Sequence, residues 1–294
     1  MDIVVKNEEL SVRVATLGAE MQSVQDSEGT EYLWNGDSAF WLGRAPNLFP
    51  YIARLTNETY TLHGKPYHMG IHGFAAKTEF AVEKQTESEV AFLLCDSTLT
   101  RESYPFRFEF RVTYRLLGRR IRICYAVGNK DHDTMYFGLG GHPGFSLPFE
   151  RGLKFEDYYL EFDEATEPIR VGFSDTCFLS GEDKPFFLMD GTKLLLSHEL
   201  FNNDAIVLKN MANGVTLKSR HGSKSLRVEY PQMRYLGIWH KPGTHAPYVC
   251  IEPWTSLPSR QSVVEEFTLQ KDLVKLPKGA VYHNEWEIEL CGKS

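Results

Sequence analysis

The chain has 294 residues, of which 42% are hydrophobic and 24% charged, a balance typical of a folded globular protein. Its formal net charge of −7, without any block of like charges, argues against nucleic acid or an acidic membrane as its main partner. The five cysteines are odd in number and form no C-x-x-C motif, which argues against a disulfide framework or a zinc site and suits a reducing compartment.

The N-terminal segment, MDIVVKNEEL, mixes charges into its apolar residues. It has no continuous apolar stretch of the length found in a signal peptide, so we expect neither a signal peptide nor a membrane-spanning helix, and a cytoplasmic location is the default expectation.

Short segments that alternate apolar and polar residues predict β-strands along the whole chain. They lie at residues 3–5, 10–14, 80–82, 90–94, 106–127, 215–217, 226–230 and 286–290. In the clearest of them, apolar residues occupy every second position of 106–116 and again of 121–127, on either side of Leu117-Gly118-Arg119. This pattern predicts a hairpin of two half-buried antiparallel strands.

The strands predict an all-β fold, either a sandwich or a barrel, because turn residues punctuate them throughout and no long amphipathic helix occurs. Residues 37–42 and 258–265 are compatible with short helices. No Pro-rich, Ser-rich or low-complexity linker divides the chain, so we expect residues 1–294 to form a single domain.

Several common catalytic machineries are missing from the sequence. It contains no G-x-S-x-G, H-E-x-x-H or P-loop motif, and the glycines of 138–144 do not complete a dinucleotide fingerprint. His68 and His72 are four residues apart, but Gly70 between them makes a helical metal pair improbable. We therefore expect neither a metal nor a cofactor.

Four segments rich in glycine, proline and aromatic residues each carry one ionisable side chain in a loop-like setting, where functional sites often lie. They are 48–55 with Arg54, 71–74 with His72, 140–145 with His142 and 250–254 with Glu252. Taken alone, the arginine is compatible with a surface ion pair and each histidine with a structural turn. The glycines beside His142 suit a tight turn as well as a binding loop.

Glu252 has the strongest functional signal of the four. It follows the apolar run Tyr248-Val249-Cys250-Ile251 and precedes a proline, so we expect its carboxyl to be partly desolvated with a raised pKa. Such a group makes a useful general base. Trp239 and Trp254 are compatible with the core and equally with a ring face offered to a sugar.

Read together and in order, these segments resemble the aldose 1-epimerase (galactose mutarotase) family, especially its divergent LacX-like branch. Residues 52–65 are similar to the family's arginine followed by a T-L-x-G-K hairpin, and Ile71-His72-Gly73-Phe74 to its histidine-glycine motif. Gly141-His142-Pro143-Gly144-Phe145 resembles the second histidine motif with altered flanks. The most specific likeness is 235–239 followed by 250–254, the glutamate segment.

The resemblance implies a large antiparallel β-supersandwich whose concave face binds an aldose, and an isomerase that interconverts the α and β anomers. It implies Glu252 as general base at the anomeric hydroxyl and His142 as general acid at the ring oxygen. It also implies His72 and Arg54 as hydrogen-bond donors near the ring oxygen and the neighbouring hydroxyls.

The resemblance further implies an aspartate that binds sugar hydroxyls. We assign it to Asp204, although Asn203 is an alternative one residue away and Asn-Asn-Asp also suits a plain turn. Asn47, Trp239 and Trp254 are expected to line the pocket, since an amide both donates to and accepts from hydroxyls.

Two other functions stay open: a sugar-binding or sensing protein of the same fold without turnover, and a mutarotase for phosphorylated hexoses. The second needs clustered cations near the pocket, for which Arg44, Arg54 and Lys241 are candidates. The sequence does not identify the preferred aldose or the oligomeric state.

Overall fold

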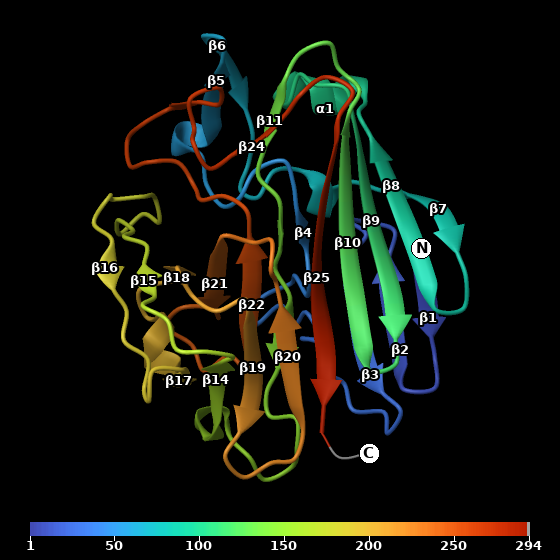
Figure 1. The fold of residues 1–294 in the computed structure, drawn as a ribbon, viewed down its shortest axis with the longest axis vertical. Helices are drawn as coiled ribbons and strands as arrows, with labels where there is room; N and C mark the ends of the chain where they lie inside the picture. The colour runs from blue at the N-terminus through green and yellow to red at the C-terminus, as the bar shows by residue number, and fades with distance from the viewer. Residues whose placement is uncertain (293–294) are drawn as a thin grey trace.

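The computed structural model describes residues 1–292, which fold into five β-sheets with short connecting helices (Figure 1). All strand pairs are antiparallel except one, the pairing of β23 with β5. The predicted all-β class is therefore confirmed, and the two largest sheets pack on each other around the main hydrophobic core.

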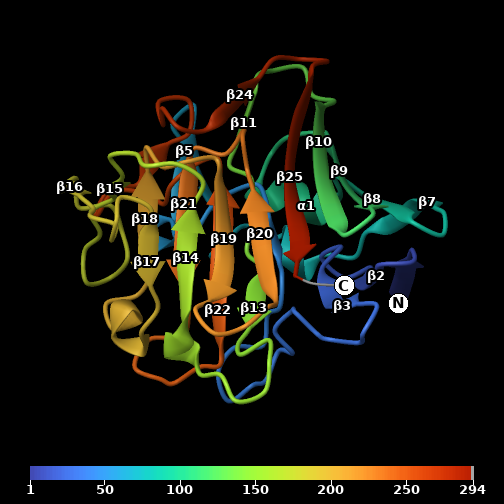
Figure 2. The ribbon, with the colours of Figure 1, turned by 60° about the horizontal axis from the view of Figure 1, so that its bottom comes forward.

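The largest sheet has nine strands, which Figure 2 shows in a row. In spatial order they are β17 (Lys193–Leu195), β14 (Tyr158–Phe162), β19 (Gly214–Ser219), β20 (Ser225–Glu229), β25 (Val281–Cys291), β10 (Arg120–Asn129), β9 (Phe108–Leu117), β8 (Glu89–Cys95) and β7 (Ala81–Gln85). β9 and β10 form the predicted hairpin, with Leu117 opposite Arg120 and Gly118 at a positive φ of 58° in the turn.

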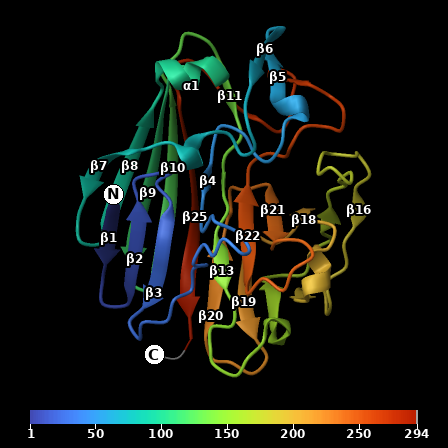
Figure 3. The same ribbon diagram turned by 180° about the vertical axis from the view of Figure 1, so that it is seen from behind.

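The second sheet has eight strands, and Figure 3 shows its central strands from the side away from the nine-stranded sheet. In spatial order they are β16 (Lys184–Pro185), β15 (Ile169–Arg170), β18 (Ile206–Lys209), β21 (Tyr235–Trp239), β22 (Tyr248–Trp254), β12 (Gly140–Gly141) and β4 (Asn47–Leu48), with β13 (Gly144–Ser146) also paired to β22.

Three small sheets complete the fold. They are β1 (Asp2–Lys6), β2 (Leu10–Ala15) and β3 (Met21–Asp26); β23 (Glu265–Glu266), β5 (Thr59–Leu62) and β6 (Lys65–His68); and β11 (Met135–Phe137) with β24 (Val274–Leu276). In Figure 3 the first of these sheets lies in front of β8, β9 and β10.

The helices are short: α1 (Thr98–Ser103) and the 3₁₀ turns η1 (Thr56–Glu58), η2 (Ala75–Lys77), η3 (Phe155–Asp157) and η4 (His198–Phe201). The short helices considered for 37–42 and 258–265 do not form, and turns and extended backbone occupy both segments. Helix α1 lies elsewhere and begins with a capping box between Ser97 and Thr100. It is six residues long, and no helix among residues 1–292 could cross a membrane.

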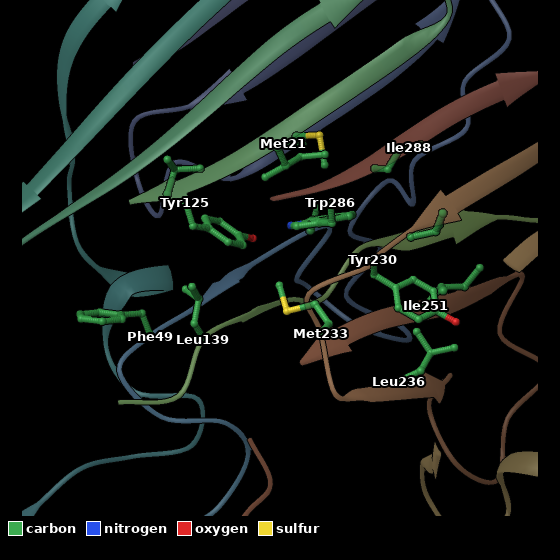
Figure 4. Close-up of a cluster of buried hydrophobic side chains, with 14 of the residues drawn as sticks. Met21, Phe49, Tyr125, Leu139, Tyr230, Met233, Leu236, Ile251, Trp286 and Ile288 are labelled. Carbon is green, nitrogen blue, oxygen red and sulfur yellow. The ribbon is translucent and has the colours of Figure 1, made fainter. Parts of the chain in front are cut away.

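The main core fills the space between the two large sheets. Figure 4 shows Trp286 and Ile288 of β25 gathered with Leu236 of β21 and Ile251 of β22 in this space. Along β9 every second residue is buried, which is the physical reason for its alternating sequence. The eight-stranded sheet is different, because β22 is buried on both of its faces.

Candidate active site

The two faces of β22 have different surroundings. Val249 and Ile251 point into the main core, whereas Tyr248 and Cys250 belong to a separate aromatic cluster with Trp34. Side chains alternate between the faces of a strand, so Glu252 lies on the same face as Cys250, away from the main core. The register of this strand thus carries the glutamate out of the main core and toward the other face of the sheet.

A cavity of about 780 Å³ lies on that face. Its wall includes seven of the eight side chains that the sequence nominated: Arg54, His72, His142, Asp204, Trp239, Glu252 and Trp254. Apolar residues, among them Leu48, Phe173 and Val207, make up much of the remaining wall. A mostly apolar cavity with a few convergent polar groups is the usual form of a small-molecule site.

His142 and Glu252 form the polar centre of this wall. The His142 Nε2 atom lies 3.1 Å from the Glu252 Oε2 atom, and only 8% of the histidine and 1% of the glutamate is exposed. Nevertheless, Oε2 of the glutamate and Nδ1 of the histidine have no hydrogen-bond partner among residues 1–292. The contact is close but not aligned as a hydrogen bond, so both groups keep hydrogen-bonding capacity.

Burial favours the uncharged form of both members of the pair. It raises the pKa of the Glu252 carboxyl well above its usual value, with a further contribution from the negative charge of Asp204. It lowers the pKa of His142 well below its usual value, with a further contribution from His72. The expected desolvation of the glutamate is thus present in the structure.

The glycines around His142 are explained by crowding. A Cβ on Gly138 would lie 2.2 Å from the Ser256 hydroxyl, and one on Gly140 would lie 2.7 Å from the Pro253 carbonyl oxygen. Neither glycine has a positive φ, so backbone freedom is not the reason for either. Only residues without a side chain let this segment approach β22 closely enough to bring His142 to Glu252.

His72 is held by a reciprocal pair of hydrogen bonds with Ala53. The Ala53 N–H donates to His72 Nδ1 at 3.1 Å, and the His72 N–H donates to the Ala53 carbonyl at 2.9 Å. Because Nδ1 accepts, we assign the proton of the neutral ring to Nε2. Burial, together with the charges of Arg54 and Lys77, lowers the pKa of His72 to about 4, so the ring is a neutral donor.

The turn that carries His72 depends on the next residue. His72 itself has a positive φ of 62°, and Gly73 follows at 73°. A Cβ on Gly73 would lie 2.3 Å from the Phe49 carbonyl oxygen, so only glycine fits there. The histidine-glycine motif is therefore a requirement of the backbone as well as of the side chain.

Asp204 lies at the edge of the same cavity. Its carboxylate accepts hydrogen bonds from the Ala205 N–H at 2.8 Å and from the Cys177 thiol at 2.9 Å. Asn203 lines the cavity too, so the alternative between these two neighbours stays open. Burial and the adjacent carboxylate raise the pKa of Cys177 to about 11, which keeps the thiol protonated as a donor.

Asn47 is the one nominated residue that does not line the cavity. Its side-chain amide donates to the carbonyls of Gly18 and Ala19 and to the Tyr114 hydroxyl, and its oxygen accepts from Tyr125. Leu48, the next residue of β4, points into the cavity in its place. The expectation for Asn47 is corrected accordingly: it lies on the core face of its strand and holds the two sheets together.

Trp41 is a cavity residue that the sequence did not single out. Its indole stacks on the His142 ring with centroids 4.8 Å apart, and Trp239 meets the same imidazole edge-on at 5.7 Å. The sequence around Trp41 contains no motif that would distinguish it from the other tryptophans. Two indoles therefore fix the plane of the imidazole.

His68, considered above with His72 as a helical pair, is exposed on strand β6, where its Nδ1 lies 3.0 Å from the Thr59 hydroxyl. The one group of potential metal ligands within residues 1–292 is instead His142, Cys250 and Glu252.

Comparison with known proteins yields consistent matches. The profile of the family described as aldose 1-epimerase matches residues 1–286. The chain is 36% identical over 286 residues to the chromosomal protein LacX of Lactococcus lactis subsp. lactis, covering 95% of this chain and 94% of that protein.

Solved structures of similar proteins also match along the whole chain. A galactose mutarotase related enzyme from Lactobacillus acidophilus superposes with a TM-score of 0.94 at 32% identity, over 100% of both chains. A galactose mutarotase-like protein from Lactobacillus casei ATCC 334 superposes with a TM-score of 0.92 at 30% identity, over 99% of this chain and 100% of that one.

Proposed function

The chain belongs to the aldose 1-epimerase family, and from that premise we propose that it is a mutarotase that interconverts the α and β anomers of an aldose. The observation that carries the proposal is the pair formed by His142 and Glu252. A carboxyl and an imidazole lie 3.1 Å apart on the wall of a cavity large enough for a sugar.

The reaction needs one base and one acid. The Glu252 carboxylate removes the proton of the anomeric hydroxyl while the bond between C1 and the ring oxygen breaks. The electron pair of that bond goes to the ring oxygen, which takes a proton from the His142 imidazolium. The open aldehyde then rotates about its C1–C2 bond and closes on its other face by the reverse transfers. Each group contributes on the order of 100-fold to 10,000-fold.

The burial of the pair suits this cycle. Carboxylate plus imidazolium and carboxylic acid plus imidazole contain the same number of protons, so both states belong to one protonation level of the pair. Ring opening converts the first state into the second, and it therefore removes two charges from a site where burial disfavours charge. Ring closure restores them, and the enzyme is ready for the next turnover without exchanging protons with the solvent.

The remaining polar wall supports binding of the sugar. His72 offers an Nε2–H donor and Arg54 a guanidinium, both suited to the ring oxygen and neighbouring hydroxyls. The carboxylate of Asp204 offers acceptors on the same cavity. The faces of Trp41, Trp239 and Trp254 are apolar surfaces on which the C–H groups of a pyranose can pack.

The phosphorylated-hexose alternative has less support, because two of its three candidate cations are engaged elsewhere. Arg44 donates to the Gln22 carbonyl at 2.7 Å and Lys241 to the Ala39 carbonyl at 3.1 Å. Neither lines the cavity, whereas Arg54 and Lys77 do. We therefore propose a free aldose as substrate.

The deciding experiment follows the approach of pure α-glucose and α-galactose to anomeric equilibrium by polarimetry or NMR, with catalytic amounts of the protein. A panel of other free aldoses and glucose 6-phosphate is measured in parallel. Acceleration with a free aldose is the expected result. If no aldose is accelerated although sugars bind, the chain is a binding protein, and a preference for the phosphate would favour the hexose-phosphate enzyme.

A further inference from the structure

Three side chains with metal-binding atoms converge behind the cavity wall. Cys250 and Glu252 are two residues apart on one face of β22, and His142 reaches them from the connection between β12 and β13. Each residue offers one ligand atom, and the three atoms lie within 4.8 Å of one another. They are the Cys250 sulfur, a carboxylate oxygen of Glu252 and an imidazole nitrogen of His142. All three side chains are buried.

One ligand atom of this cluster is unsatisfied. Glu252 Oε2, which lies 3.1 Å from His142 Nε2, is buried and has no hydrogen-bond partner within the described chain. A buried polar atom without a partner costs about 1–3 kcal/mol, and a bound ion is one of the partners that can satisfy it. A sugar explains one side of the pair, but it does not explain the thiol behind it.

We propose that His142, Cys250 and Glu252 form a binding site for a single Zn²⁺ ion and that the bound ion inhibits the protein. This goes beyond the proposed function, since sugar chemistry requires no such site. Sulfur, imidazole nitrogen and carboxylate oxygen are the three ligand types that Zn²⁺ prefers, and hard cations such as Mg²⁺ do not select this set.

The geometry is close to that of a zinc site. Zinc bonds of about 2.0–2.3 Å in a tetrahedron separate ligand atoms by about 3.3–3.8 Å. The His142 and Glu252 atoms are 3.1 Å apart, and no pair of ligand atoms exceeds 4.8 Å, so small side-chain rotations complete the site. Because His142 and Glu252 line the cavity, the ion enters from there and its fourth position faces the cavity.

Inhibition follows from the same contacts. Binding removes the proton of the Cys250 thiol to solvent and leaves the sulfur as thiolate, while Glu252 binds as carboxylate and His142 through a nitrogen lone pair. The ion then occupies the electron pairs that the carboxylate and the imidazole need for proton transfer. A protein with zinc bound therefore holds neither a free base nor a free acid at this position.

Binding is tested directly on the purified full-length chain without sugar, by competition with a zinc-sensitive chromogenic chelator. The expected result is one Zn²⁺ per chain. Cys250→Ser is expected to weaken the affinity by at least about tenfold, because an oxygen replaces the soft ligand. The matched control is Cys95→Ala, which removes an exposed cysteine and leaves zinc affinity unchanged.

Cobalt supplies a spectroscopic signature of the sulfur ligand. Co²⁺ in place of Zn²⁺ is expected to show thiolate-to-cobalt charge-transfer absorption in wild type and in Cys95→Ala but not in Cys250→Ser. A cooperative thermal unfolding transition without zinc shows that the variant is folded. With zinc, the transition temperature rises only for a protein that binds the ion in its folded state. Wild type should gain stability from zinc and Cys250→Ser should gain less.

The proposal is overturned if wild type binds no zinc, if Cys250→Ser binds it as tightly as wild type, or if Cys95→Ala abolishes binding. These readouts do not depend on the mutarotase proposal, so each idea can fail alone. If anomer exchange is observed, micromolar zinc should slow it, and the sensitivity of Cys250→Ser to zinc, relative to its own metal-free rate, should fall in parallel with its affinity. Exchange that continues unchanged in the zinc-bound protein would also overturn the inhibitory role.

Discussion

The indole of Trp41 stacks on the imidazole of His142, with ring centroids 4.8 Å apart and the planes inclined by 28°. An aromatic face stabilises a cation above it by about 0.5–2 kcal/mol, and the imidazolium is the form that we propose to protonate the ring oxygen. The stacked indole thus offsets part of the desolvation that disfavours this charged form.

Replacing Trp41 by leucine should therefore slow anomer exchange. Loss of about 0.5–2 kcal/mol corresponds to a decrease in kcat of roughly 2-fold to 30-fold, whereas Trp41→Phe keeps an aromatic face and should lose less. Saturation-transfer NMR of the two anomers measures both rates. A leucine variant as fast as wild type, or a phenylalanine variant as slow as the leucine one, would rule out this role.

Glu252→Gln removes the proposed base with little change in shape. Turnover should fall by at least about 100-fold while sugar binding persists, because the amide cannot accept the anomeric proton but can still contact the hydroxyl. Exchange rates and calorimetric sugar binding are measured together. The control is Glu285→Gln, the same chemical change on an exposed residue of β25, which should leave both unchanged. Undiminished turnover in Glu252→Gln would end the assignment.

Chelator treatment separates the proposed chemistry from a metal-dependent one. In the proposed mechanism, proton transfer between Glu252, the sugar and His142 is complete without an ion, so long incubation with EDTA should leave the exchange rate the same. If the preparation already carries zinc on the pair, removal should raise the rate. A loss of activity that a divalent ion restores would contradict the mechanism.

Gly237 of β21 lies opposite Glu252 in the strand register. A Cβ there would lie 3.0 Å from Trp254 Cζ2 and 3.2 Å from Glu252 Cβ, so alanine must displace the indole or the glutamate. We expect Gly237→Ala to cost about 1–3 kcal/mol of stability, and the displaced base should lower kcat/KM by about tenfold. Thermal unfolding and anomer exchange measure the two effects.

The matched control for Gly237→Ala is Gly128→Ala in β10, another strand glycine with a negative φ. The nearest atom to its added Cβ is the Lys130 Cε at 3.5 Å, which is an ordinary contact. This variant should resemble wild type in both measurements. Equal behaviour of the two variants would show that the space beside Glu252 is not restrictive.

The strands could be predicted because burial on one face imposes alternation. The hairpin of β9 and β10 follows the sequence pattern residue by residue, since the two-residue turn fixes the register. Short helices could not be predicted in this way, because they show no such alternation. Helix α1 is too short to show a period, and its capping box between Ser97 and Thr100 was the only local signal.

The candidate site shows a similar division. Glu252, His142 and His72, which the motifs nominated, all line one cavity. Each lies near a glycine where an added Cβ would crowd its neighbours, so the surrounding sequence is restricted and forms a recognisable motif. Asn47 was misplaced because a strand of two residues gives no alternation from which to tell its faces, and the asparagine faces the core. Trp41 was missed because stacking depends on chain packing that no local pattern encodes.

His240 should make the stability of the protein depend on pH. The ring is fully buried and packs on Phe201, donates from Nδ1 to the Lys241 carbonyl at 2.9 Å, and has Nε2 3.1 Å from His198 Nδ1. Burial lowers its pKa to about 4, although the bond to Lys241 opposes the shift. Below its ordinary value near 6.5 the unfolded chain binds this proton and the folded chain does not.

The free energy of unfolding should therefore fall as the pH drops from about 6.5 toward 4, by up to about 1.4 kcal/mol per pH unit for each such histidine. His240→Asn should be less stable than wild type at pH 7.5 because of lost packing, yet its stability should fall less steeply over this range. Urea unfolding at closely spaced pH values measures the slopes, with exposed His283→Asn as the control. Parallel slopes for wild type and His240→Asn would mean that His240 takes up its proton over the same pH range in the folded and the unfolded protein.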